Sequence, residues 1–338
     1  MPVEGKRELE EGRSAADRAL GPRHRPGRDR SIGGPPVTPA VLGLHIGGSK
    51  THAVRSDEAQ KLSGSPGSAA DEITESSANL SSVGHQGADA VLRRIAASVG
   101  RGVQAVCAGA AGADTPASRA VLSALLMEHF PGAKVEVVHD TRIVLAAAGL
   151  DAGAVLVAGT GSVAWGRNAD GREARSGGYG YLLGDEGSGY SVVRDAVREA
   201  LREHYAGLEP GILVRALMEA TASADALQLM DFFYAKPEPD HWASLAPLVL
   251  EFASEGDPAA VRIQAEAAHS LATLARQVLG ELGLDLPLVM AGGLLVNQSR
   301  LAGAVARKVS LEDPSSVRIL TQAPVHGAVE LARQLIRN

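Results

Sequence analysis

The sequence contains one cysteine and no long apolar segment. Because Cys107 stands alone, a single chain can form neither a disulfide framework nor a cysteine-ligated zinc or iron–sulfur site. No apolar run approaches the roughly 20 residues of a membrane helix. The N-terminus also lacks the apolar region of a signal peptide. We therefore expect a protein of the reducing cytoplasm that has no membrane partner.

Aromatic residues and an excess of positive charge are also lacking. Only 3% of the residues are aromatic, so Leu, Val and Ala must build the core. The 33 basic and 39 acidic residues give a formal charge of −6, and no basic face is apparent. This composition argues against a nucleic-acid partner. The length of 338 residues favours two domains over one.

The N-terminal segment differs from the remainder. Residues 1–40 hold 6 of the 17 prolines, with 8 basic against 6 acidic residues and no apolar periodicity. Such a segment buries too little apolar surface to fold, so we expect a disordered tail.

One hairpin pattern occurs twice in the remaining chain. Residues 41–46 form an apolar run, followed by a glycine turn and a second short run at 51–54. About 110 residues later the pattern returns, with runs at 154–158 and 163–166 around another glycine turn. The repeat predicts a duplicated α/β protein with a cleft between its halves. We place the domains at 41–148 and 149–338.

The apolar spacing predicts the other elements. Strands are expected at 103–107, 135–138 and 288–291, and helices at 89–99, 118–130, 141–148, 189–204, 211–220, 241–255, 257–282, 301–311 and 327–337.

The two glycine turns are candidate phosphate-binding sites. Turns of this kind present backbone N–H groups to anions with no side chain in the way. A glycine hairpin alone is usually just a turn, but two at matching places favour a clasp on a polyphosphate. The candidate residues are Gly47, Gly48, Ser49 and Lys50 in the first turn, and Gly159, Thr160, Gly161 and Ser162 in the second.

An aspartate stands where a strand gives way to a helix. Asp140 follows the strand expected at 135–138 and opens the helix expected at 141–148. Ligands of α/β folds bind at this edge of the sheet, where a carboxylate can take the proton of an attacking hydroxyl. The simpler interpretation is a helix N-cap.

A glycine-rich stretch at 177–189 contains adjacent acids, Asp185 and Glu186. Its glycines allow close backbone approach, and the acids are suited to sugar hydroxyls or hydrated Mg²⁺. Farther along, Gly292 and Gly293 follow an apolar strand, where a flat base could lie against the backbone.

Together and in order, these motifs resemble the BadF/BadG/BcrA/BcrD ATPase family, which includes N-acetylglucosamine kinases. The likeness covers about residues 41–337. It implies two ribonuclease-H-like, actin-like ATPase domains with a cleft, and a last helix that returns to the first domain. It also implies an ATP- and Mg²⁺-dependent kinase acting on an amino sugar such as N-acetylglucosamine or glucosamine.

The resemblance also assigns residues. Leu44–Thr51 matches the first phosphate motif, which adds Thr51 to the phosphate-binding candidates, and Ala158–Ser162 matches the second. Ala291–Gly293 matches the adenosine motif, and Asp140 the catalytic base. The implied sugar-binding positions are Asn79, Asp140, Thr160, Gly178 and Asp185.

One position departs from the family. His45 stands where the family has an aspartate that holds hydrated Mg²⁺, and imidazole is a poor ligand for this ion. Either ATP and other acids hold the metal, or turnover is slow, or the protein is a sugar- or nucleotide-binding sensor without turnover. The family's dehydratase-activating branch needs cluster cysteines that are lacking here. Base rates for oligomers favour a homodimer.

Overall fold

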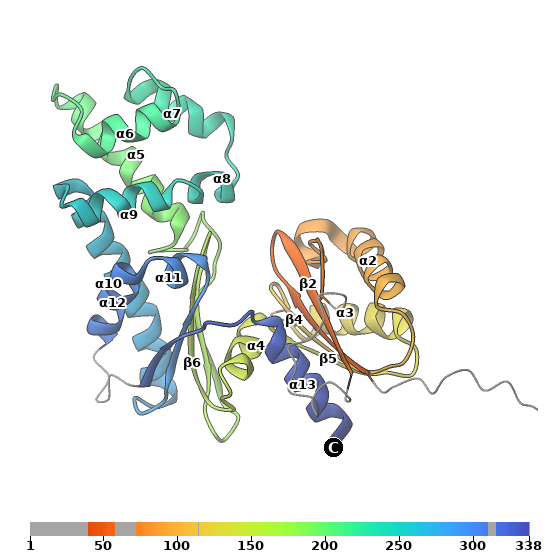
Figure 1. Ribbon diagram of the computed structural model, residues 1–338. Coiled ribbons are helices and arrows are strands. Elements are labelled where there is room, and N and C mark those ends of the chain that lie inside the picture. The colour runs from red at the N-terminus through yellow and green to blue at the C-terminus, as the bar shows by residue number, and fades with distance from the viewer. Residues whose placement is uncertain (1–39, 58–71, 114, 310–315, 338) are drawn as a thin grey trace, which may run out of the picture. The chain divides into compact units, whose positions relative to one another are not determined.

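The computed structural model describes residues 40–57, 72–113, 115–309 and 316–337. The tail expected at 1–40 lies outside these residues, except for Ala40, which is the first residue of β1 rather than part of the tail. The described chain forms two five-stranded sheets with helices on both faces of each (Figure 1).

The first sheet has the strand order β3-β2-β1-β4-β5. Strand β1 is antiparallel to β2 and parallel to β4, which is parallel to β5. Four helices accompany it. The elements are β1 (Ala40–Ile46), β2 (Lys50–Asp57), β3 (Glu72–Ser76), α2 (Leu80–Val99), β4 (Val103–Ala110), α3 (Pro116–His129), β5 (Lys134–His139), α4 (Asp140–Ala147) and α13 (Val325–Arg337).

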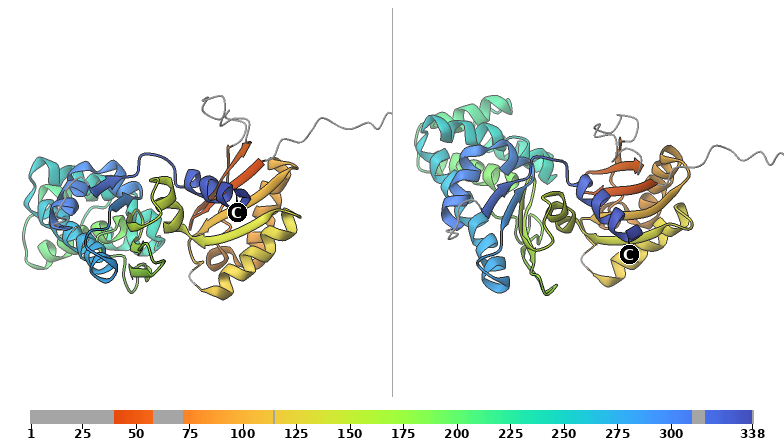
Figure 2. Two further views of the ribbon diagram at one scale, coloured as in Figure 1. Left: turned by 90° about the horizontal axis from the view of Figure 1, so that it is seen from below. Right: turned by 60° about the horizontal axis from the view of Figure 1, so that its bottom comes forward.

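Alternation along the strands places these helices on opposite faces of the first sheet. On β1, Leu42 and Leu44 pack with residues of α2 and α3, whereas Val41 packs with α4 and α13. The last helix of the chain, α13, therefore lies on the first sheet, as the views in Figure 2 also show.

Two glycines allow this return. A Cβ atom at Gly327 on α13 would lie only 1.9 Å from the carbonyl oxygen of Ile143 on α4. A Cβ atom at Gly43 on β1 would lie 2.5 Å from the backbone nitrogen of Val329 on α13. Both contacts are with backbone, which cannot move aside as a flexible side chain can.

The second sheet repeats the first, with the order β10-β9-β6-β7-β8. Strand β6 is antiparallel to β7 and parallel to β9, as β1 is to β2 and β4. The elements are β6 (Gly153–Ala158), β7 (Ser162–Arg167), β8 (Glu173–Gly177), α5 (Gly189–Tyr205), α6 (Ile212–Ala220), α7 (Ala226–Ala235), α8 (Pro239–Ala243), α9 (Ala246–Glu255), α10 (Pro258–Leu282), β9 (Leu288–Ala291), α11 (Gly293–Asn297), α12 (Ser299–Val309) and β10 (Val317–Ile319). The duplicated hairpin expected from the sequence is present.

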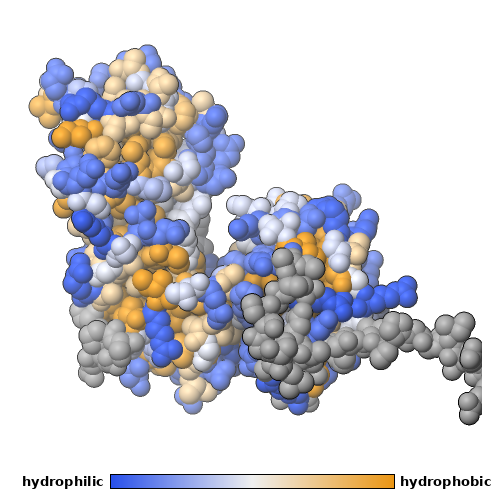
Figure 3. Space-filling view, in the orientation of Figure 1, coloured by the Kyte–Doolittle hydropathy of each residue, from blue (hydrophilic) through white to orange (hydrophobic). Residues whose placement is uncertain are grey.

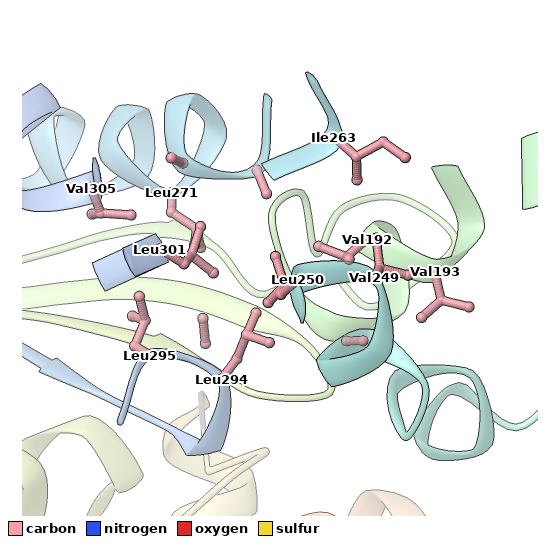
Figure 4. Packing of buried hydrophobic residues seen from close by; sticks show 14 of the residues in the cluster. Val192, Val193, Val249, Leu250, Ile263, Leu271, Leu294, Leu295, Leu301 and Val305 are labelled. Carbon is pink, nitrogen blue, oxygen red and sulfur yellow. The ribbon is translucent and has the colours of Figure 1, made fainter. Parts of the chain in front are cut away.

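The helical core beside the second sheet is mainly aliphatic, as the scarcity of aromatic residues requires, with Phe233 as its buried aromatic residue. Figure 4 shows Val192 of α5, Leu250 of α9, Leu271 of α10 and Leu295 of α11 in one cluster, all nearly or fully buried. Apolar side chains are also exposed over α6 and α7 (Figure 3), among them Ile212 and Tyr234. None of the described helices has the length and apolar character needed to cross a membrane.

Several elements were not expected. The structure adds α7 and the short strands β3, β8 and β10, and it divides the helix expected at 241–255 into α8 and α9. Pro247 lies in the first turn of α9. A helix continuing through it would lose a backbone hydrogen bond and place the ring against the preceding turn, which explains the break.

Candidate active site

The turn between β1 and β2 presents an exposed tip. The amide of Gly47 donates to the carbonyl of Lys50 at 2.9 Å and closes the hairpin. Gly48, Ser49 and Lys50 are exposed, and a Cβ atom at Gly48 would meet no atom within 4 Å. The tip is therefore accessible to a phosphate group, with a lysine beside its glycines.

Thr51 lies next to this tip, with its side chain turned into the protein. Its side chain is fully buried, and its Oγ1 accepts a hydrogen bond from the amide of Ala78 at 2.9 Å. This hydroxyl oxygen ties β2 to the start of α2, so a phosphate contact of Thr51 stays a prediction for its backbone rather than its side chain.

Asn79 is connected to the same hairpin. Ser77 Oγ donates to the Gly47 carbonyl at 2.7 Å and accepts from the Asn79 amide at 3.0 Å. Asn79 Oδ1 caps α2 by accepting from the Ser81 amide at 2.9 Å. Its side-chain NH₂ group then remains for a sugar hydroxyl, and Oδ1 keeps a second lone pair. Sequence reasoning missed Ser77, whose role depends on a hydrogen bond across 30 residues.

Asp140 lies at the end of β5 as the first residue of α4. The N-cap of α4 is His139 and not Asp140, so capping does not account for the aspartate. Its carboxylate is 23% exposed, and its Oδ1 lies 3.0 Å from His139 Nδ1. Burial raises the pKa of Asp140, but the contact with His139 and the His45 imidazole outweigh it, and the net shift is downward. The carboxylate is thus ionised at neutral pH, as a proton acceptor must be.

His45 faces this carboxylate from β1. It pairs with His52 on β2 and with Gly109 on β4, one strand away from β5. Burial lowers the pKa of His45, against the opposing influence of Asp140. At neutral pH the imidazole is therefore uncharged, and it neither repels a cation nor supplies the anionic oxygen that Mg²⁺ prefers.

The turn between β6 and β7 is more constrained than the first. Gly159 N donates to the Gly161 carbonyl at 3.0 Å, and Thr160 is exposed. Ser162 is 3% exposed, its amide donates to Asp185 Oδ1 at 3.1 Å, and its hydroxyl donates to the Glu186 carbonyl at 2.8 Å. Both donors of Ser162 are thus occupied, so it holds the acidic loop and is not a phosphate ligand as it stands.

The predicted sugar-binding residues of the second half surround this turn. Asp185 has a left-handed backbone with φ of 61°, and a Cβ atom at Gly161 would lie 2.7 Å from its carboxylate. Gly178, with φ of 72°, donates its amide to the Ser162 carbonyl at 3.0 Å. The carbonyl of Gly178 accepts from Arg175 Nη2 at 2.8 Å. Burial is the largest cause of the raised pKa of Asp185.

A recess of about 310 Å³ lies next to the same turn. It brings Gly159 and Thr160 together with Gly293 of the predicted adenosine motif. Gly292 allows this approach: its φ is 89°, and a Cβ atom there would lie 2.3 Å from the carbonyl oxygen of Ala158. The volume and the exposed backbone suit a nucleotide.

The rest of this recess was missed by sequence reasoning. Its other lining residues are Gly189, Asp240, Ala243, Ser244, Pro247, Leu294, Asn297 and Gln298. Gly189 ends the glycine-rich stretch at 177–189, but the others come from segments up to 139 positions after Gly159 that no local motif marks.

The described residues do not contain a complete metal cage. No group of three His, Cys, Asp or Glu side chains within 40–57, 72–113, 115–309 and 316–337 is placed to hold an ion. Mg²⁺ commonly binds through one or two carboxylates together with substrate phosphates. Asp140 fits such a partial role, and the nucleotide would supply the remaining oxygens.

Comparison with known proteins leads to the same family as the sequence motifs. The model of the BadF/BadG/BcrA/BcrD ATPase family matches residues 42–332. The N-acetylmuramic acid/N-acetylglucosamine kinase of Clostridium acetobutylicum is 30% identical over 308 residues, which are 87% of this chain and 98% of that protein. The N-acetyl-D-glucosamine kinase of Dictyostelium discoideum is 28% identical over 316 residues, covering 86% and 97%.

Solved structures confirm the predicted α/β fold class. A candidate N-acetylglucosamine kinase from Porphyromonas gingivalis has a TM-score of 0.69 at 23% identity, covering 86% of this chain and 97% of that one. Another, from Chromobacterium violaceum, has a TM-score of 0.67 at 22% identity, covering 88% and 100%. The resemblance inferred from the motifs is thereby confirmed, and the chain is a member of the BadF/BadG/BcrA/BcrD ATPase family.

Proposed function

We propose that the protein is an ATP-dependent kinase of amino sugars, with N-acetylglucosamine as the leading substrate. A sugar hydroxyl attacks the γ-phosphorus of ATP. The new O–P bond forms as the bond to the β-phosphate oxygen breaks, ADP leaves, and the hydroxyl proton passes to a carboxylate. Relatives named for this activity align along nearly their whole length.

Asp140 is the proposed base. It lies at the carboxyl edge of the first sheet and is ionised at neutral pH. Its side chain is only partly exposed, which limits competition from water. General base catalysis by a positioned carboxylate contributes about 10²- to 10⁴-fold to a rate.

The second half is the proposed nucleotide platform. The recess beside Gly159, Thr160 and Gly293 takes the adenosine, and the exposed turn at Thr160 meets the phosphates. Helix α5 starts beside this turn, because the Gly189 amide donates to the Gly159 carbonyl at 2.8 Å. The first amides of α5 are satisfied within the protein, so the helix contributes the field of its dipole.

The sugar contacts are proposed for four residues besides the base. Asn79 offers its NH₂ group, Gly178 and Thr160 line the approach, and Asp185 offers the carboxylate oxygen that does not hold Ser162. A pocket whose polar groups pair with sugar hydroxyls rejects analogues that lack them.

The alignment of 87% and 86% of the chain with two amino-sugar kinases carries this proposal, and an assay of ADP release tests it. N-Acetylglucosamine, glucosamine, N-acetylmuramic acid and glucose are supplied with ATP and Mg²⁺. We expect sugar-dependent ADP release with an N-acetylated amino sugar, and a phosphorylated sugar detectable by mass spectrometry. Saturable sugar and ATP binding without ADP release would instead identify a sensor, the alternative that His45 raises.

A further inference from the structure

A second, larger recess lies away from the nucleotide recess. Its volume is about 400 Å³, and its walls come from α3, β5, α4, β7, β8 and α13. Seven of its twelve lining residues have polar side chains: Arg119, Glu136, His139, Arg142, Arg167, Glu173 and Gln334. None of the residues assigned above to ATP or sugar binding is among its lining residues.

Two arginines in this recess hold buried nitrogen atoms with no partner. Arg142 Nη1 and Arg167 Nε are inaccessible to solvent and lack a hydrogen-bond acceptor. Neither side chain has a hydrogen bond or an ion pair within the part of the chain that the structure describes. Buried donors in native proteins are nearly always satisfied, by protein, water or ligand.

The two guanidinium groups also repel each other. The pKa of Arg142 is lowered, first by burial and then by the charge of Arg167, while Asp151 and Glu136 oppose the shift. An acceptor with two or more oxygens would pair with both groups and offset this repulsion. Planar guanidinium groups bind such oxyanions through charge-assisted, often bidentate hydrogen bonds.

The balance of charge limits what the recess can hold. Three arginines stand against the carboxylates of Glu136 and Glu173, so the lining carries a net charge of only +1. That suits one phosphate group and disfavours a di- or triphosphate. We propose that this recess is a binding site for a single phosphate group, free or as a monoester, held by Arg142 and Arg167.

The recess also shares a wall with the proposed catalytic centre. His139 lines it and lies 3.0 Å from Asp140 Oδ1. Trp165 lines it too, and its ring stacks on that of His139 with centroids 6.4 Å apart and planes 9° apart. Binding of a ligand in this recess can therefore be followed by Trp165 fluorescence, and it can affect the proposed base Asp140 through His139.

Trp165 fluorescence tests the site directly. In a Trp242→Phe protein, Trp165 is the remaining tryptophan. Inorganic phosphate is titrated at constant ionic strength, with chloride as the reference anion. We expect a saturable change in fluorescence, and an affinity at least tenfold weaker in the Arg142→Gln and Arg167→Gln variants. Arg172→Gln is the matched control, because Arg172 is exposed and paired with Glu281.

A thermal series gives a second readout. A ligand that binds only the folded state raises Tm with its concentration. Phosphate should raise the Tm of the wild type and of Arg172→Gln. The increase should be smaller for Arg167→Gln. The two glutamine variants should not lose stability without phosphate, since each removes one of two repelling charges.

Comparing two ligands shows whether the site takes a free phosphate ion or a phosphate monoester. Tighter binding of N-acetylglucosamine 6-phosphate than of inorganic phosphate would assign the site to a sugar phosphate, and the reverse order to the free ion. Either order supports the site. The proposal is overturned if the wild type shows no saturable response to either compound, or if the Arg142 and Arg167 variants respond as Arg172→Gln does.

Discussion

The two glycine hairpins come from one sequence pattern but are held differently. The first has an exposed tip, with open space around Gly48 and with Lys50 exposed. The second is fixed from several sides: Asp185 lies against Gly161, and both donors of Ser162 are occupied. The first half thus combines an accessible cationic tip with Asp140, whereas the second half holds its turn rigidly, as the proposed platform for the nucleotide requires. Duplicated folds can divide chemistry and binding in this way.

The largest effect is expected from a substitution that removes only the proposed base of the first half. In Asp140→Asn the amide keeps the shape of the carboxylate but cannot accept the hydroxyl proton. We expect kcat to fall by about 10²- to 10⁴-fold, with sugar and nucleotide binding retained in calorimetry. Asp170→Asn, a change in an exposed turn, is the control. A fall of less than about tenfold would leave Asp140 without the role of base.

A change at Asp185 tests the binding half. Asp185→Ala removes both the oxygen proposed for the sugar and the acceptor of the Ser162 amide. We expect sugar affinity to fall by about 10- to 100-fold, the range for a lost hydrogen bond to a charged group. Calorimetric titration of the sugar measures this. Unchanged affinity would show that the carboxylate only holds the turn.

Two glycine substitutions test directly whether the second hairpin turn is more constrained than the first. Gly161→Ala places a Cβ atom 2.7 Å from the Asp185 carboxylate, whereas Gly48→Ala meets open space. We expect Gly161→Ala to lower the free energy of unfolding by about 1–3 kcal/mol, as overpacking does, and Gly48→Ala to change it by less than about 0.5 kcal/mol. Denaturant titrations decide. Equal effects would mean that the two turns are equally constrained.

The smallest expected effect concerns His45. In His45→Asp a carboxylate would orient the water shell of Mg²⁺, so the concentration needed for half-maximal rate should fall by about fivefold or less, as expected for one weak, water-mediated charge contact. The new charge also faces Asp140 and should raise the pKa of that base. Mg²⁺ titrations of rate for both proteins measure the effect. An identical Mg²⁺ dependence would exclude contact with the metal shell.

The imidazole of His45 should also make the stability of the folded protein depend on pH. Burial lowers its pKa in the folded protein, so the unfolded chain is protonated first as pH falls below about 6.5. The folded state should therefore lose stability from that pH downward, and His45→Gln should remove this part of the loss. Thermal unfolding of both proteins between pH 5 and 7 would show it, and parallel curves would contradict it.

The hairpins, most helices and the position of Asp140 could be predicted from the sequence. They depend on glycine turns and apolar spacing, which neighbouring residues specify. The break between α8 and α9 could also have been predicted, since Pro247 marks it. Strands such as β3 and β10 could not, because their segments are too short for an alternating pattern to stand out, and each is held by pairing with the preceding strand.

The sequence by itself determined the duplicated architecture, the family and the aspartate at the strand end. Only the tertiary structure decided which polar groups remain for a ligand. Thr51 and Ser162 belong to glycine motifs, but the Thr51 hydroxyl accepts a hydrogen bond from Ala78 and the Ser162 hydroxyl donates one to Glu186, while Arg142 and Arg167 belong to no motif and have none. The reason is physical: backbone shape follows from adjacent residues, whereas a hydrogen bond is satisfied or left open by whichever distant segment folds against it.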